Sequence, residues 1–417
     1  MASDEIKPFQ ISIPESQLSD LKERLARVRY PDELEDAGWE NGVPLAEAQR
    51  LTKYWAESFD WRKAEARLNE FPHFTTDLQA DGFETLTVHF IHQRSSSTDE
   101  DAAVPLLYLH GWPGSFYEGT KIIQPLAQGS GGGGGSGGEP SFHVVAPSLV
   151  NFGFSQGTRK RGFSIQHQAE IMHKLMLRLG YQRYAVQGGD WGWFVARALS
   201  LRYPDHAVAQ HLNLDLASPP TWTQHPFLAL KHAVTPYTPR EKTGLARMEL
   251  FKAQGSGYNA VQGTRPQTLG YGLADSPAGL LAWIYEKLRE WTDDYAWTDD
   301  EVCTWISIYW FSTAGPTASW RLYHEFFSAH APGVRPGAVL MSDLQRWQPR
   351  VKIGLARFPM DVAHSPHIWG HTLGDVVFEK THESGGHFPV WECPDAVIAD
   401  LREMFAKGKP ARKAVGT

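Results

Sequence analysis

Short apolar runs alternate with amphipathic stretches through the middle of the chain. Residues 104–109, 142–146 and 184–186 are almost entirely apolar, which is typical of strands buried on both faces of a parallel sheet. Residues 166–179 carry apolar side chains at helical spacing, and residues 194–199 follow the last of these strands as a second helix. The alternation predicts an α/β fold with a doubly wound, mostly parallel sheet.

The first hundred residues have a different pattern. Leucines recur at helical spacing after Pro14, and a second helical pattern begins at Pro44. No alternation of strands and helices is apparent before Thr75, and a strand-like alternation of apolar and polar residues covers residues 85–91. We therefore expect residues 1–100 to form a helical meander followed by the first strands.

Two segments interrupt the alternation. Residues 129–138 are almost pure Gly and Ser, which predicts a flexible surface loop with no function of its own. Residues 217–330 are mostly helical in pattern and aromatic, which predicts a helical cap inserted into the sheet domain. Seven of the sixteen tryptophans fall in this cap: Trp222, Trp283, Trp291, Trp297, Trp305, Trp310 and Trp320. Such side chains fill cores and line apolar pockets, so the cap is a candidate pocket wall.

The strand pattern returns after the cap. Residues 354–358 and 376–378 read as the last strands, ahead of a C-terminal helix that begins near Pro394. The chain is therefore expected to consist of a meander with the first strands, a first part of the core, a cap and a second part of the core. The corresponding residues are 1–100, 101–216, 217–330 and 331–417.

Composition narrows the class of protein. The 417 residues are 42% hydrophobic and 21% charged, as in a soluble globular protein, and the net charge of −7 leaves no basic surface for nucleic acid. No apolar run reaches the roughly 20 residues of a membrane span, and residues 1–5 do not resemble a signal peptide. Cys303 and Cys393 lie outside any metal-type spacing and fit a reducing, cytoplasmic setting.

Asp190 lies in the segment Gln187-Gly188-Gly189-Asp190-Trp191-Gly192, between a predicted strand and a predicted helix. Strand, glycine-rich turn and helix resemble the nucleophile elbow of α/β-hydrolases, where serine is the usual residue. An aspartate here can also be purely structural, because Asp caps helices and favours turns. The segment predicts an α/β-hydrolase fold with Asp190 as the candidate nucleophile.

An oxyanion hole is expected beside this elbow. His110-Gly111-Trp112-Pro113-Gly114 follows the predicted strand 104–109. In the α/β-hydrolase fold, this loop and the residue after the nucleophile each supply one backbone N–H. The two donors would be the amides of Trp112 and Trp191. A cis peptide bond before Pro113 is compatible with the sequence but is not predicted by it.

A base and an acid are expected after the later strands. His387 lies in a turn flanked by Gly385 and Gly386, which permit closer approach to the elbow than is expected for His382. Asp361 precedes His387 by 26 residues, so the order of nucleophile, acid and histidine is that of α/β-hydrolases. Spacing alone leaves three other carboxylates open as the acid: Asp375, Glu383 and Glu392.

Aspartate in place of serine restricts the reaction. Serine attacking an sp³ carbon would leave a stable ether, whereas a carboxylate leaves an ester that water can cleave. His387 would activate water against the carbonyl carbon of Asp190, and the Trp112 and Trp191 amides would stabilise the oxyanion. The substrate is thus expected to be an epoxide or an alkyl halide, and the Asp-Trp pair does not distinguish the two.

The whole set of motifs resembles the microsomal-type epoxide hydrolases, in a soluble fungal-like form, over nearly the whole chain. The resemblance rests on Ile6-Lys7-Pro8-Phe9, Tyr30-Pro31, His110 to Gly114, Gln187 to Asp190, Gly257-Tyr258, Asp275-Ser276-Pro277, Leu281 to Leu288, Trp291-Thr292, Phe358-Pro359 and Gly385 to Phe388.

This resemblance implies further roles. Two cap tyrosines, which match Tyr258 and Tyr323, would donate to the epoxide oxygen, and a Phe-Pro-X pattern favours Asp361 over Asp375 as the acid. It also implies a homodimer without a membrane anchor, and a reaction that needs neither a metal ion nor an organic cofactor. The family usually has Pro-Gly after Pro-Ser-Leu, whereas this chain has Val150-Asn151, which bears on substrate preference rather than mechanism.

The sequence therefore predicts an epoxide hydrolase that converts apolar or aryl epoxides to vicinal diols. Two alternatives stay open. A haloalkane or haloacid dehalogenase on the same scaffold would not need the tyrosine pair. A non-catalytic relative that binds a ligand or a protein would not need Asp190, His387 or the oxyanion loop.

Overall fold

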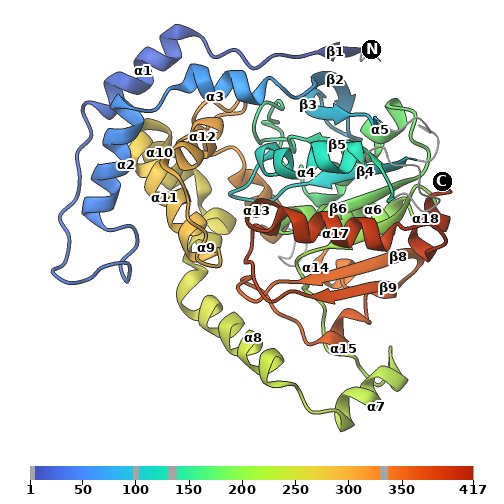
Figure 1. Cartoon of the computed structure of the whole chain (residues 1–417). Helices are drawn as coiled ribbons and strands as arrows, with labels where there is room; N and C mark the ends of the chain where they lie inside the picture. The colour runs from blue at the N-terminus through green and yellow to red at the C-terminus, as the bar shows by residue number, and fades with distance from the viewer. Residues whose placement is uncertain (1–4, 97–102, 130–138, 329–336, 417) are drawn as a thin grey trace.

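The structure is a computed structural model in which residues 5–96, 103–129, 139–328 and 337–416 are described. Within these ranges a nine-stranded sheet forms the centre of the protein (Figure 1). The strands are β1 (Ile6–Pro8), β2 (His73–Gln79), β3 (Thr85–Gln93), β4 (Val104–Leu109), β5 (Phe142–Pro147), β6 (Tyr184–Gly188), β7 (Ala207–Leu212), β8 (Gln348–Arg357) and β9 (Gly374–Thr381). Nearly all of the predicted Gly/Ser loop and the predicted boundaries near residues 100 and 330 lie outside the described residues.

The strands are arranged in the order β1-β2-β3-β5-β4-β6-β7-β8-β9. The pairs from β1 to β5 are antiparallel, and the pairs from β5 through β4 to β9 are parallel. The carboxyl ends of these parallel strands meet at one edge, where ligand sites form in open α/β sheets. The prediction of a mostly parallel α/β sheet is confirmed.

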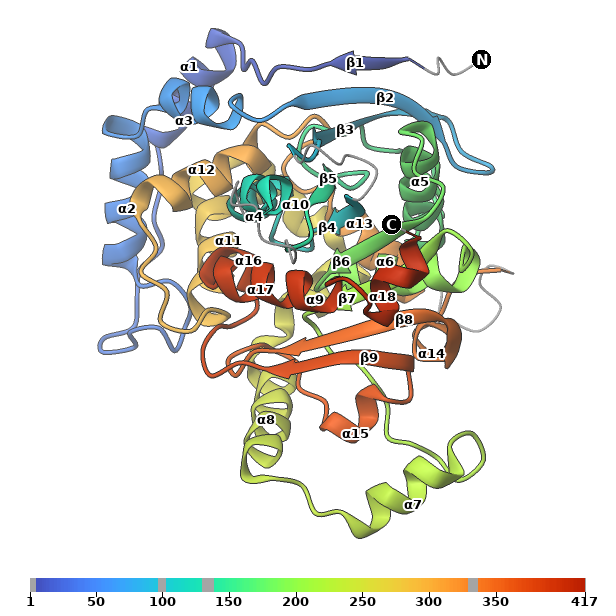
Figure 2. The ribbon, with the colours of Figure 1, turned by 45° about the vertical axis from the view of Figure 1, so that its right-hand side comes forward.

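Helices cover both faces of the sheet (Figures 1 and 2). On one face α5 (Ile165–Arg178) packs beside α6 (Trp191–Arg202), and on the other α4 (Phe116–Gln128) packs beside α16 (Pro389–Glu392) and α17 (Pro394–Met404). The remaining helices of the core are α14 (Met341–Leu344), α15 (His367–Gly370) and α18 (Pro410–Val415). Strands β4, β5 and β6 are buried along their whole length because helices cover both of their sides.

The expected strands at 85–91, 104–109, 142–146 and 184–186 fall within β3, β4, β5 and β6. The structure adds β1, β2 and β7, which were not predicted. β1 has only three residues and carries no pattern to detect. β7 was missed because the buried strand contains Gln210 and His211, which interrupt its apolar run.

The segment between β7 and β8 is helical, as expected for the cap. It contains α7 (Pro226–Val234), α8 (Pro239–Leu250), the π-helix η2 (Phe251–Gly255), α9 (Gly257–Thr264), α10 (Pro266–Asp275), α11 (Pro277–Glu290), α12 (Asp299–Trp310) and α13 (Trp320–Ser328). The helices α9 and α13 contact each other closely and carry the two predicted tyrosines. Both tyrosines therefore lie on one pair of contacting cap helices.

The N-terminal helices α1 (Glu15–Leu25), α2 (Leu45–Glu57) and α3 (Trp61–Leu68) pack on the outside of the cap, beside α11 and α12 (Figure 1). The guanidinium of Arg50 donates to both carboxylate oxygens of Asp299, at 2.6 and 2.9 Å. The Trp55 indole donates to the Ser307 hydroxyl at 3.1 Å. These bonds join the meander to the cap.

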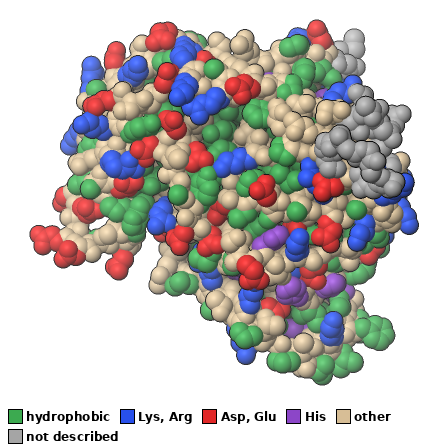
Figure 3. Space-filling model, in the orientation of Figure 1, with side chains coloured by type: hydrophobic (Ala, Val, Ile, Leu, Met, Phe, Trp, Pro, Cys, Tyr) green, Lys and Arg blue, Asp and Glu red, His purple; other side chains and the backbone are tan. Residues whose placement is uncertain are grey.

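Helix α7 projects away from the sheet and from the rest of the cap (Figures 1 and 2). Phe227, Leu230 and Val234 are 87%, 53% and 72% exposed. Their spacing puts them on one side of the helix, and hydrophobic side chains gather at this end of the molecule in Figure 3. We refer to these three residues as the exposed apolar face of α7.

Candidate active site

Asp190 occupies the turn between β6 and α6. Its backbone has φ 46° and ψ −129°, a left-handed conformation that costs a non-glycine residue about 1–3 kcal/mol. A Cβ on Gly192 would collide with the backbone carbonyl of Leu109, so only glycine permits α6 to start this close to β4. The turn lifts the Asp190 side chain above the carboxyl ends of the strands, as a nucleophile elbow does.

The predicted oxyanion loop lies against this carboxylate. The Trp112 amide donates to Asp190 Oδ1 at 2.7 Å, and the Trp112–Pro113 peptide bond is cis. Trp191 is the first residue of α6, so its amide has no acceptor within that helix. His110 fixes the loop from below, because its Nε2 accepts from the Leu149 amide at 3.1 Å. Burial lowers the pKa of His110 to about 4, which keeps the ring neutral for this role.

His387 lies between two carboxylates. Its Nδ1 is 2.7 Å from Asp361 Oδ1, and its Nε2 is 3.6 Å from Asp190 Oδ2. The Val362 amide also donates to Asp361 Oδ1, at 2.7 Å, which fixes the acid. The side chains of His387 and Asp361 are only 2% and 3% exposed. The structure brings together the three residues that the sequence selected.

The two carboxylates control the charge of His387. Burial alone would lower its pKa, but the negative charges of Asp361 and Asp190 outweigh burial and raise it to about 10. At neutral pH the resting site therefore holds an imidazolium between two carboxylates. Both carboxylates contribute to this shift, so loss of the Asp190 charge would lower the His387 pKa.

The other candidates for the acid and the base lie elsewhere. Asp375 pairs with Lys352 at 2.6 Å, and Glu383 is 92% exposed. His382 Nε2 lies 2.6 Å from Asp400 Oδ2. Their partners leave Asp361 as the carboxylate that bonds His387 among the described residues.

Glu392 has a role that spacing did not predict. Its carboxylate accepts the amides of Asp293, at 2.7 Å, Phe388, at 3.0 Å, and Gly386, at 3.2 Å. Asp293 belongs to the cap and in return accepts the Gly385 amide at 2.8 Å. Glu392 therefore ties the loop of His387 to the cap.

Tyr258 and Tyr323 lie over Trp112 and Trp191, the two tryptophans of the predicted oxyanion hole. The ring of Tyr258 stacks on Trp112 with centroids 5.1 Å apart, and the ring of Tyr323 meets Trp191 edge-on at 4.6 Å. The two tyrosine rings are 6.1 Å apart. Burial raises the pKa of both phenols, and the Tyr323 hydroxyl has no hydrogen-bond partner among the described residues.

Four other tyrosines of the cap have different environments. The Tyr309 hydroxyl donates to the Gly114 carbonyl at 2.6 Å, Tyr285 donates to Glu47 at 3.1 Å, and Tyr295 donates to Glu301 at 2.8 Å. Tyr271 is 72% exposed. The geometry therefore separates Tyr258 and Tyr323 from the rest.

The cap tryptophans take several positions. Trp291 reaches the site, because its ring lies edge-on to His387 at 5.0 Å and its carbonyl accepts the His387 amide at 2.7 Å. Trp305 donates to the Pro113 carbonyl and so holds the oxyanion loop. Trp222, by contrast, is 63% exposed.

A small cavity of about 20 Å³ lies beside the triad. It is bordered by Asp190, His387, Trp112 and also Glu118, which the sequence analysis did not select. Glu118 is the last residue of a Ser115-x-x-Glu118 capping box at the start of α4. The capping-box pattern directly follows the predicted oxyanion motif, residues 110–114. It is the sequence signal that could have identified Glu118.

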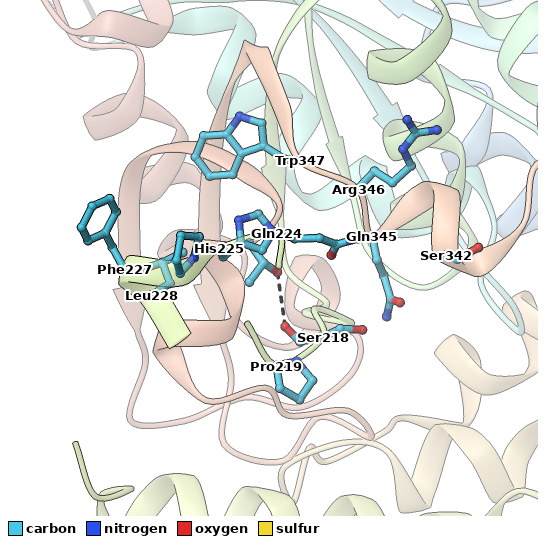
Figure 4. Close-up of a pocket in the computed structure, with 12 residues that line it drawn as sticks. Ser218, Pro219, Gln224, His225, Phe227, Leu228, Ser342, Gln345, Arg346 and Trp347 are labelled. Carbon is cyan, nitrogen blue, oxygen red and sulfur yellow. Dashed lines mark hydrogen bonds between the residues drawn. The ribbon is translucent and has the colours of Figure 1, made fainter. Parts of the chain in front are cut away.

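A larger hollow of about 730 Å³ lies beside α7, bordered by Ser218, His225, Phe227, Arg346 and Trp347 among others (Figure 4). The Thr372 hydroxyl donates to the Ser218 carbonyl at 3.3 Å across one side of it. None of the predicted site residues borders this hollow, so its size does not make it the reaction site.

The described residues contain neither a metal-type cluster nor a membrane-spanning helix. No group of three or more His, Cys, Asp or Glu side chains in those ranges could hold a metal ion. No helix there is both long and apolar enough to cross a membrane.

Comparison with known proteins gives the family. Residues 6–119 match the family described as "Epoxide hydrolase N terminus", and residues 104–226 match "alpha/beta hydrolase fold". Epoxide hydrolase 1 of Sus scrofa is 34% identical over 425 residues, which cover 97% of this chain and 89% of that protein.

Two solved structures agree over the whole length. The epoxide hydrolase of Aspergillus niger is 33% identical with a TM-score of 0.80, and the match covers 96% of both chains. The juvenile hormone epoxide hydrolase of the silkworm Bombyx mori is 30% identical with a TM-score of 0.83, covering 100% of this chain and 95% of the other. The chain therefore belongs to the epoxide hydrolase family and is an enzyme built on the α/β-hydrolase fold.

Proposed function

We propose that this enzyme converts apolar epoxides, including aryl epoxides, to vicinal diols through a covalent ester on Asp190. One observation carries the proposal. The Asp190 carboxylate lies between the Trp112 amide, at 2.7 Å, and His387 Nε2, at 3.6 Å, while Asp361 holds the other side of the imidazole. Nucleophile, oxyanion donor, base and acid are thus within reach of one reacting carbon.

In the first step, Asp190 attacks the less hindered epoxide carbon from the rear. The C–O bond of the epoxide breaks, and its oxygen takes a proton from Tyr258 or Tyr323. Burial raises the pKa of both phenols, which keeps them protonated until the alkoxide forms. The unpartnered Tyr323 hydroxyl supports this role, since a buried O–H without an acceptor is costly unless a ligand supplies one.

In the second step, His387 activates water against the ester carbonyl of Asp190. Formation of the ester removes the Asp190 charge, which is one of the two charges that raise the His387 pKa. His387 can then release its proton more readily, and this proton restores the tyrosine that protonated the epoxide oxygen. The neutral imidazole can act as a base. The Trp112 and Trp191 amides would stabilise the oxyanion, and loss of one such donor typically costs about 2.7–4 kcal/mol.

The surroundings of Asp190 support an apolar substrate. The rings of Trp112, Tyr258, Trp291 and Tyr323 contact one another above the carboxylate, with centroid distances of 5.1 to 6.2 Å. Such a lining favours alkyl and aryl groups over charged ones. A dehalogenase would need only N–H donors for its leaving group, so the two buried hydroxyls favour an epoxide.

The direct test is diol formation from styrene oxide-like and aliphatic epoxides, with Asp190→Asn as the control. The proposal predicts diol from the wild type and a loss of at least roughly 10⁴-fold in the variant, as for removal of other covalent nucleophiles. Halide release from haloalkanes without epoxide turnover would instead support the dehalogenase alternative.

We also propose that the protein is a homodimer, as the family resemblance implies. The exposed apolar face of α7 is the candidate contact, because exposed apolar side chains on one helix face favour association. Light scattering after size-exclusion chromatography would test this, with a dimer expected for the wild type and a monomer for Phe227→Asp. The cytoplasmic location predicted from the two cysteines, both free thiols, likewise stays a proposal.

A further inference from the structure

Glu118 is a buried carboxyl group that the proposed reaction does not yet use. It lies in the first turn of α4, is 6% exposed, and its Oε1 accepts the Ser115 amide at 3.1 Å. A capping-box glutamate needs no burial for that bond. Glu241 makes the corresponding bond to Thr238 from a more exposed position in α8. Capping alone therefore does not explain why Glu118 faces the interior.

The cavity beside Glu118 is the size of one water molecule. Its volume is about 20 Å³, and a water needs roughly 10–15 Å³ of such space and two to four polar partners. Asp190, His387 and Glu118 all border it. A water in this cavity therefore has these three side chains among its neighbours.

The backbone around Glu118 leaves room for its carboxyl group. A Cβ on Gly114 would displace Glu118 Oε1, so glycine at this position leaves the carboxyl group its place. The Tyr309 hydroxyl holds the Gly114 carbonyl at 2.6 Å from the cap side. The Tyr108 hydroxyl interacts with the same carboxyl from β4. The group is thus fixed from three sides.

The charge of Glu118 suits a position next to Asp190. Burial, more than the nearby Asp190 charge, raises the pKa of Glu118 to about 8, although His387 opposes the shift. The carboxyl is therefore largely neutral at pH 7 and does not repel the nucleophile. A neutral carboxyl keeps acceptor capacity for further hydrogen bonds beyond the one from Ser115.

We propose that Glu118 binds the water that hydrolyses the Asp190 ester, an inference that rests on the proposed function. One O–H of the water donates to Glu118, and the other proton passes to His387 Nε2. The water oxygen then forms a bond to Asp190 Cγ, and the ester C–O bond breaks. The alkoxide leaves with the proton from His387, which yields the diol and the free carboxyl group.

The test separates the two steps in Glu118→Gln and Glu118→Leu by rapid mixing with a chromogenic epoxide. Glutamine has one acceptor oxygen for two donors, the Ser115 amide and the water, and leucine has none. Ester formation should stay within about threefold of wild type, while ester hydrolysis falls roughly 10- to 100-fold, more in the leucine variant. Glu241→Gln and Glu241→Leu are the matched controls and should change neither step.

Other outcomes would overturn the inference. Unchanged hydrolysis in Glu118→Gln, or equal losses in both steps, would mean that the residue acts only through structure. Glu118→Gln keeps the capping bond, so it gives an answer even if Glu118→Leu does not fold. If the wild type forms no ester on Asp190, the proposed function fails as well. A different result separates the two proposals. If His387→Gln traps an ester on Asp190, but the Glu118 variants hydrolyse their ester as fast as the wild type, only the role of Glu118 fails.

Discussion

The active site has two halves that are built in different ways. The sheet half holds Asp190, His387 and Asp361 on loops at strand ends, fixed by hydrogen bonds of 2.7 Å such as Trp112 to Asp190 and His387 to Asp361. The cap half holds Tyr258 and Tyr323 on helices, fixed by ring packing. In the proposed mechanism the sheet half carries the groups for attack and hydrolysis, and the cap half carries the two tyrosines that protonate the leaving oxygen.

The two halves are also tied together. Tyr309 and Trp305 of the cap donate to the carbonyls of Gly114 and Pro113 in the oxyanion loop. Glu392 binds cap and histidine loop at once, through amides at 2.7 to 3.2 Å. A cap that only covered the site would not need these bonds. We infer that the cap helps to set the geometry of the sheet half.

The largest expected effect lies in the sheet half. His387→Gln removes the base but not the nucleophile, so steady-state diol formation should fall by at least about 10³-fold while the first ester still forms. Mass spectrometry of the intact protein should then detect an adduct with the mass of one substrate molecule. Turnover without a trapped adduct would contradict the assignment of Asp190 as the nucleophile and His387 as the base.

The next effect lies in the cap half. Tyr258→Phe combined with Tyr323→Phe removes both proton donors, and ester formation from an epoxide should fall roughly 10²- to 10³-fold, by analogy with lost oxyanion donors. Ester hydrolysis should change little. Tyr271→Phe is the matched control, because that residue is 72% exposed. Intact epoxide turnover in the double variant would contradict the proposal that the two tyrosines protonate the epoxide oxygen.

A smaller effect should appear in the pH dependence of hydrolysis. The Asp361 carboxylate raises the pKa of His387, and hydrolysis needs the neutral ring, so the rate should rise with pH. Asp361→Asn removes that charge, lowers the His387 pKa, and should move the rising limb to lower pH by about one to two units. The plateau should fall, because the ring loses its orienting partner. A shift to higher pH would contradict the predicted sign.

The smallest effect is expected outside both halves. Arg50→Ala breaks the pair of hydrogen bonds to Asp299 that joins the meander to the cap. Arg50 is 49% exposed, so unfolding by urea should lose less than about 1 kcal/mol, and kcat should not change. A tenfold change in kcat would mean that the meander positions the cap half.

The same contrast explains what the sequence could predict. Asp190, Trp112 and His387 stand next to apolar strands in glycine-rich turns, so local pattern leads to them. Tyr258 and Tyr323 have no such local signal among the cap tyrosines, and the family resemblance was needed to select them. Their geometry agrees with that selection, while the catalytic roles stay predictions.

Other parts of the molecule could not be predicted from the sequence, for physical reasons. β7 carries buried polar residues that disturb its apolar run, and β1 is too short for a pattern. Glu118 and Glu392 act through backbone amides and a cavity that only the folded chain creates. Spacing along the sequence contains no measure of such contacts.

The most direct test of the proposed covalent ester on Asp190 is a single turnover with excess enzyme in ¹⁸O-labelled water. An ester on Asp190 means that the added oxygen of the first diol comes from the carboxylate. The covalent mechanism predicts label in the peptide that contains Asp190 and an unlabelled first diol. Label in the first diol, with none in that peptide, would mean direct attack by water and would contradict the covalent mechanism.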